Sequence, residues 1–187
     1  MNETQFEKGK VTVVIPVYNE ERYLRETLDS VVSQVDCVII GDNASTDSTE
    51  SICHEYVEKY AHIQYFRNEQ NIGSIKNIVL CFEKVKTEFF FTMGGHDRIA
   101  PNFVEITKNR LQSSDQNVAG VVTSHRWIDN DGNTISIKSS SHDSYFKELV
   151  QSFSVEDPFY RVYRYANSFY LLTFSEILDH ASEISIL

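Results

Sequence analysis

The chain has 187 residues, of which 41% are hydrophobic, so we expect one domain with a core of ordinary size. Its formal net charge is −10, and no cluster of lysine and arginine stands out from the rest of the sequence. This charge argues against a nucleic-acid partner, because phosphate binding normally needs a basic surface.

The three cysteines, Cys37, Cys53 and Cys81, lie in apolar segments, and their spacing fits no zinc site. We expect them to be reduced core thiols of a cytoplasmic protein. Residues 1–10 are polar and lack the apolar stretch of a signal peptide. No apolar run approaches the roughly 20 residues that a membrane-spanning helix needs. Peripheral association with the inner face of the membrane is left open.

Residues 1–100 alternate between short apolar runs and amphipathic segments. The apolar runs predict strands at 11–17, 37–40, 63–66 and 88–93, and apolar residues at helical spacing between them predict three helices. We expect Asn19 to cap the first helix, and Asp47 with Glu50 to form a capping box for the second. The repeated strand-helix pattern predicts an α/β fold with a mostly parallel sheet and helices on both faces.

The pattern changes after Pro101. A helix is predicted at 103–111 and a strand at 118–125. The letters "DNDG" at 129–132 predict a hairpin turn, with residues 134–138 as the returning strand. A further helix is predicted at 145–153, followed by an aromatic-rich end that either covers the core or forms a surface for a homodimer.

The loops after the four predicted strands meet at the carboxyl edge of one sheet, where open α/β sheets bind ligands. They read "PVYNE", "GDNASTD", "RNEQNIG" and "GGHD", and they contain carboxylates and amides but no glycine-rich phosphate cradle. Asp42 could accept a hydrogen bond from an imide N–H of a base such as uracil. Each residue also has a plainer interpretation, because Asp47 can be a helix cap and Asn71 with Gly73 can build a turn.

Together, "VVIPVYNEERYLRETLDSVVSQ", "IIGDNASTDST", "NIGSIKN" and "FFFTMGGHDRIAPNFVE" resemble the family 2 inverting glycosyltransferases of the GT-A fold. The order and spacing match over residues 11–105. The resemblance implies that residues 1–100 bind a nucleotide-sugar and that residues 101–187 are an abbreviated acceptor half of the same domain. Implied donor-nucleotide contacts are Pro16, Val17, Tyr18, Glu20, Asp42, Asn43, Asn71, Gly73 and Lys76.

The family's metal-binding D-x-D-D motif falls on Gly94-Gly95-His96-Asp97, where a glycine and a histidine replace two of the acids. Asp97 is therefore implied to hold the diphosphate and a Mn²⁺ or Mg²⁺ ion, with His96 either as a second ligand or as a hydrogen-bonding residue. Inverting transfer also needs a general base. Asp157 is the preferred candidate, and Glu156 and the hairpin acids Asp129 and Asp131 are alternatives; the hairpin acids also suit an ordinary turn.

These residues predict an enzyme that moves a sugar from a nucleotide-diphosphate donor, most simply a UDP-sugar, to a glycan or lipid-linked saccharide. The missing acids leave open a second hypothesis, a module that binds a nucleotide-sugar without efficient transfer. A phosphoacceptor signalling domain is a third hypothesis. It would need an acid pair after the first strand and a lysine after the last one, and the sequence offers neither.

Overall fold

The computed structural model describes residues 6–114, 118–123, 127–129, 132–136, 170–173 and 185–186. The helix predicted at 145–153, and the candidate bases Asp131, Glu156 and Asp157, lie outside these ranges. A seven-stranded sheet with the order β3-β2-β1-β4-β8-β5-β9 forms the centre, and β6 and β7 pair separately. The strands are β1 Glu7–Val17, β2 Cys37–Asp42, β3 Ile63–Arg67, β4 Thr87–Thr92, β5 Val118–Val122, β6 Trp127–Ile128, β7 Thr134–Ser136, β8 Tyr170–Thr173 and β9 Ser185–Ile186.

Within the described ranges the helices are α1 Leu24–Val31, α2 Thr49–Lys59, α3 Ser74–Phe82 and α4 Phe103–Gln112. The predicted alternation of strand and helix is therefore confirmed, although β1 begins earlier than expected, at Glu7. The predicted hairpin is confirmed by the antiparallel pairing of β6 and β7. No helix in the described part of the chain is both long and apolar enough to cross a membrane.

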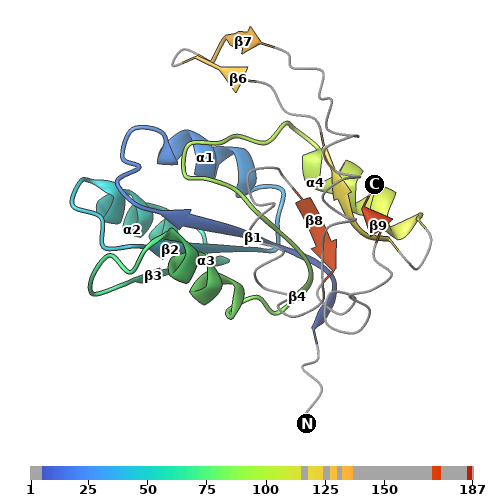
Figure 1. Cartoon of the computed structure of the whole chain (residues 1–187), viewed down its shortest axis with the longest axis horizontal. Coiled ribbons are helices and arrows are strands. Elements are labelled where there is room, and N and C mark those ends of the chain that lie inside the picture. The colour runs from blue at the N-terminus through green and yellow to red at the C-terminus, as the bar shows by residue number, and fades with distance from the viewer. Residues whose placement is uncertain are drawn as a thin grey trace.

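The sheet is covered on both faces because successive side chains of a strand point to opposite sides. Val13 and Ile15 join the core that α1, α2 and α4 cover. Val14, between them, joins a second core with Ile78 and Phe82 of α3. In Figure 1, β1 runs between α1 above and α3 below. The predicted arrangement of helices on both faces is thus confirmed.

The strand order explains why α3 lies on the face opposite α1, α2 and α4. The chain moves from β1 through β2 to β3, and α3 then returns it past β1 to β4. All of these strands are mutually parallel, and right-handed crossovers in opposite directions place helices on opposite faces. The order therefore reverses between β1 and β4, which is where open α/β sheets form their ligand crevice.

One predicted helix cap is wrong, and the other forms only in part. The residue before α1 is Tyr23, and no side chain caps that helix. Asn19 has a left-handed φ of 57°, and its side-chain oxygen accepts a hydrogen bond from the Thr46 backbone N–H instead. Asp47 Oδ1 accepts the Thr49 N–H at the start of α2 (2.9 Å), but no capping box forms, because Glu50 pairs with Arg67 of β3 (3.2 Å). Asn19 and Glu50 thus have partners in distant segments, which local sequence spacing does not encode.

Candidate active site

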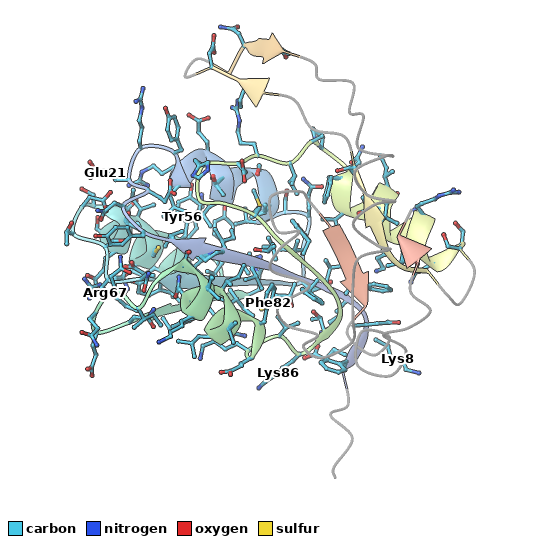
Figure 2. All side chains as sticks on the ribbon, viewed as in Figure 1. Lys8, Glu21, Tyr56, Arg67, Phe82 and Lys86 are labelled. Atoms are coloured by element: carbon cyan, nitrogen blue, oxygen red, sulfur yellow. The ribbon has the colours of Figure 1, made fainter. Side chains whose placement is uncertain are left out.

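The loops that follow β1 and β2 form one hydrogen-bonded unit at the carboxyl edge of the sheet. The Asn43 N–H donates to the Val17 carbonyl (2.9 Å), and the Asn19 N–H donates to the Ser45 hydroxyl (3.0 Å). In Figure 2, Glu21 and Arg67 lie at the end toward which β1 points, whereas Lys86 lies at the opposite end of the sheet. The four predicted loops therefore share one rim.

Asp42 is fully buried, and the protein itself satisfies its carboxylate. Oδ1 accepts hydrogen bonds from the N–H and the hydroxyl of Ser45 (2.8 and 2.6 Å), and Oδ2 accepts one from the Tyr65 hydroxyl (2.9 Å). The Arg67 Nε lies 3.5 Å from Oδ2. A carboxylate has about four acceptor positions, so these four groups match its capacity. Burial and the hydrogen bond to Asp42 raise the pKa of Tyr65.

A chain of asparagine side chains ties the loop after β3 to the end of β2. Asn43 donates to Asn71 (2.8 Å) and accepts from Asn68 (3.1 Å), and Asn68 also donates to Asn77 of α3 (2.9 Å). Asn77 in turn donates to the Gly41 carbonyl (2.7 Å). Asn43 and Asn71, both predicted donor contacts, thus lie together. The Asn71 oxygen also accepts the Gly73 N–H (2.9 Å), and this bond matches the plainer interpretation that Asn71 and Gly73 build a turn.

The loop "GGHD" after β4 folds into a turn against the loop "PVYNE". The Asp97 Oδ2 accepts the Gly94 N–H (3.0 Å), and Thr27 of α1 donates to the Gly95 carbonyl (2.9 Å). A Cβ on Gly95 would stand 2.8 Å from the Glu20 Cγ, so only glycine lets the two loops approach this closely. His96 Nδ1 lies 2.9 Å from Glu20 Oε1. This hydrogen bond raises the pKa of His96, although partial burial opposes the shift.

His96 and Asp97 fit a divalent cation as a partial ligand set. A Cβ on Gly94 would stand 3.0 Å from Asp97 Oδ2 and 3.3 Å from His96 Nε2, so both side chains meet beside a residue that has none. Among the described residues, neither Asp97 Oδ1 nor His96 Nε2 makes a hydrogen bond. No cluster of three or more metal-binding side chains occurs in the described part of the chain. A cation held here would therefore take its other ligands from a bound molecule or water.

The other predicted residues differ in exposure and in position. Pro16 is half-buried and Val17 is buried, whereas Tyr18 is 46% exposed and Lys76 is exposed on α3. Asp129 closes the β6–β7 hairpin, because its carboxylate accepts the backbone and side-chain N–H groups of Asn133 (2.8 and 3.2 Å). This contact matches the turn interpretation of Asp129.

Sequence reasoning missed Tyr65 and Arg67. Arg67 bridges Asp42, Glu50 and the Ser45 carbonyl, and it brings a positive charge to an edge that is otherwise rich in acids. Its position at the end of the third strand was a usable signal, since that strand end belongs to the same rim as Asp42. Tyr65 gave no such signal, because a tyrosine within a short strand is more often a core residue.

Comparisons with known proteins find relatives in sequence and in fold. A glycosyltransferase of Rickettsia typhi that is itself uncharacterized is 29% identical over 150 residues, which cover 78% of this chain and 43% of that protein. The crystal structure of Staphylococcus aureus TarS with UDP-GlcNAc superimposes with a TM-score of 0.56, at 23% identity over 70% of this chain and 38% of the other. The Pyrobaculum calidifontis mannosyltransferase PcManGT, in complex with GDP-Man and Mn²⁺, gives 0.59 at 17% identity, over 90% of this chain and 46% of the other.

The chain spans less than half the length of each of these proteins. The structural likenesses confirm the predicted GT-A fold. The profile of glycosyl transferase family 2 matches residues 12–168, which is most of the chain and includes all four loops of the rim. This chain therefore belongs to glycosyl transferase family 2.

Proposed function

We propose that this chain transfers a sugar, with inversion, from a nucleotide-diphosphate donor to a hydroxyl group of a glycan or lipid-linked saccharide. The observation that carries the proposal is the convergence of the four family loops on one sheet edge, at the point where the strand order reverses. UDP is the preferred nucleotide, and the TarS complex with UDP-GlcNAc supports that choice. A cytoplasmic location, peripheral membrane association and homodimerisation belong to the proposal as well.

The donor nucleoside would lie along residues 16–20 and the loop that Asp42 and Asn43 organise. Tyr18 supports this placement, because an exposed aromatic ring beside a polar rim suits stacking on a base. Lys76, also exposed, would approach the diphosphate. In this proposal, residues 1–100 hold the donor and residues 101–187 supply the acceptor side.

Transfer with inversion is a single displacement. The acceptor oxygen forms a bond to the anomeric carbon from the face opposite the nucleotide, and the bond between that carbon and the diphosphate oxygen breaks. The hydroxyl proton passes to a carboxylate, for which Asp157 is the candidate, and the negative charge remains on the departing nucleoside diphosphate. A divalent cation, when bound, would neutralise part of that charge, and His96 Nε2 with Asp97 Oδ1 would hold it.

Melting temperatures with UDP, GDP and dTDP, each with and without Mn²⁺, test the donor half of the proposal. A ligand at 100 times its dissociation constant stabilises the folded state by about 2.7 kcal/mol, so UDP should raise the melting temperature visibly. Asp97→Ala should remove only the Mn²⁺-dependent part of the UDP shift. Glu105→Ala, an exposed acid on α4, is the matched control and should change nothing.

Release of UDP from a UDP-sugar in the presence of Mn²⁺ then separates the two candidate functions. Slow hydrolysis of the donor supports the transferase, because water can replace the missing acceptor. Tight binding of UDP without turnover on any acceptor would instead support the nucleotide-sugar-binding module. Absence of any shift with all three nucleotides would contradict both.

A further inference from the structure

Glu20 and His96 form a contact that the expected roles of these residues do not explain. Glu20 belongs to the loop after β1, and His96 to the loop after β4, 76 positions further along the chain. Their side chains nevertheless meet at 2.9 Å, through Glu20 Oε1 and His96 Nδ1. The acid is mostly covered, with 20% of its side chain exposed, whereas the imidazole is 60% exposed. A covered carboxylate thus holds one edge of a ring whose other edge is accessible.

This contact determines which nitrogen of the His96 ring donates a proton to Glu20. An ionised carboxylate can only accept hydrogen bonds, so His96 Nδ1 must carry the proton that it donates to Glu20. In the neutral imidazole, the lone pair is then on Nε2. A metal-binding histidine commonly donates its second nitrogen to a carboxylate in this way, which sets both the tautomer and the direction of the ring.

Glu20 is itself held firmly. Its backbone N–H donates to the Thr49 hydroxyl (2.8 Å), and its carbonyl accepts the N–H groups of Tyr23 and Leu24 (3.2 and 3.0 Å). Its side chain packs on Gly95, where any Cβ would collide with it. The carboxylate is therefore positioned by α1, α2 and the turn after β4, and it transmits that position to His96.

The replaced acids of the D-x-D-D motif make room for this arrangement. His96 Nε2 and Asp97 Oδ2 both approach the point where a side chain on Gly94 would begin, at 3.3 and 3.0 Å. An aspartate at position 94 would crowd the imidazole. Gly94 therefore leaves space that the side chains of His96 and Asp97 share.

We propose that Glu20 is a positioning residue that holds His96 as the Nδ1–H tautomer, so that Nε2 and the Asp97 carboxylate together present two ligands to the cation that accompanies the donor diphosphate. This inference rests on the proposed function, because the cation matters only if the site binds a nucleoside diphosphate. The rival explanation is an ordinary surface ion pair that fastens two loops together.

Two measurements on the full chain distinguish these explanations. The first is the ¹⁵N-detected tautomer of His96 without any ligand, and the second is Mn²⁺ affinity in the presence of UDP, followed by electron paramagnetic resonance. Glu20→Ala should give a mixture of tautomers and weaken Mn²⁺ binding about 10–100-fold, the range typical of outer-shell changes. UDP affinity measured with Mn²⁺ should fall more than UDP affinity measured without it, because only the former includes the cation. Glu20→Gln keeps the size of the side chain and therefore its packing on Gly95. Its Mn²⁺ affinity and its proportion of the Nδ1–H tautomer should lie between those of the wild type and Glu20→Ala.

Glu26→Gln is the matched control. Glu26 pairs with Arg98 at 2.9 Å, two residues beyond His96, so this variant breaks an ion pair on the same loop without touching the imidazole. It should lower neither the Mn²⁺ affinity nor the proportion of the Nδ1–H tautomer. Unchanged tautomer and Mn²⁺ affinity in Glu20→Ala, while the wild type binds Mn²⁺ with UDP, would overturn this inference alone. Failure of the wild type to bind UDP at all would overturn the proposed function, and this inference with it.

Discussion

The carboxylate of Asp42 has no exposed surface, and it accepts hydrogen bonds from Ser45 and Tyr65 while Arg67 lies beside it. A buried charge without such partners would cost several kcal/mol, so these residues are required before any ligand arrives. A mutation of Asp42 would thus disturb the fold as well as the candidate site. The hydroxyl of Tyr65 is the more selective target.

Tyr65→Phe should lower the free energy of unfolding by about 1.5–3 kcal/mol, because a hydrogen bond to a buried charged group is lost while the ring is kept. Urea denaturation measures this change. Tyr18→Phe is the comparison, since its side chain is largely exposed, and it should stay within about 0.5 kcal/mol of the wild type. Equal effects of the two substitutions would contradict the view that the Tyr65 hydroxyl stabilises Asp42.

The neighbours of Gly41 leave no space for a side chain at this position. A Cβ there would overlap Cys81 Sγ and stand 2.8 Å from Phe66 Cζ. Gly41→Ala should therefore destabilise the fold by about 1–3 kcal/mol through overpacking. Adding Cys81→Ala removes the sulfur, so the double variant should lose at least about 0.5 kcal/mol less than the sum of the single variants. Strict additivity in denaturation experiments would show that the clash is relieved elsewhere.

At the scale of elements, the asparagine chain joins α3 to β2 and to the loop after β3. Asn43 and Asn77 are its buried members, and Asn77 hydrogen-bonds both the Gly41 carbonyl and the Asn68 amide. Elements joined in this way cannot shift independently, so the positions of Asn43 and Asn71 at the rim depend on a residue that lies below it. The geometry of the candidate site is therefore partly set by α3.

Asn77→Ala should cost about 1–3 kcal/mol, because the Gly41 carbonyl loses a buried hydrogen bond and the Asn68 amide keeps only its bond to Asn43. It should also raise the dissociation constant of UDP if the loop carrying Asn71 loosens. Thermal melting with and without UDP measures both effects. Asn109→Ala on the exposed surface of α4 is the control, and it should change stability by less than about 0.5 kcal/mol.

At the scale of the whole molecule, the sheet separates two cores, and each contains one buried cysteine. Cys53 of α2 belongs to the first core and Cys81 of α3 to the second, whereas Cys37 is half-buried at the start of β2. None of the three forms a disulfide, in agreement with the expectation of reduced thiols. The reactivity of Cys53 and Cys81 therefore shows whether both faces of the sheet are covered.

Burial raises the pKa of both Cys53 and Cys81 to about 12, from an ordinary value of 9.0. At pH 9, an ordinary thiol is half ionised and reacts with iodoacetamide, but these two stay protonated and covered. Mass spectrometry of the native protein should therefore show modification at Cys37 first, and all three sites only in denaturant. Rapid native labelling of Cys81 would mean that α3 does not cover its face of the sheet.

The sequence by itself determined the order of strands and helices, the shared sheet edge of the four loops, and the family to which they belong. It could do so because β-branched runs, helical spacing and loop motifs are local features, and right-handed crossovers leave few topologies for such an order. Only the tertiary structure decided that Asn19 and Glu50 serve neighbouring loops rather than helix ends, that Tyr65 and Arg67 complete Asp42, and that Glu20 holds His96. These pairings join residues 17 to 76 positions apart, and a contact between distant residues depends on where the packed sheet brings them, which no local pattern records.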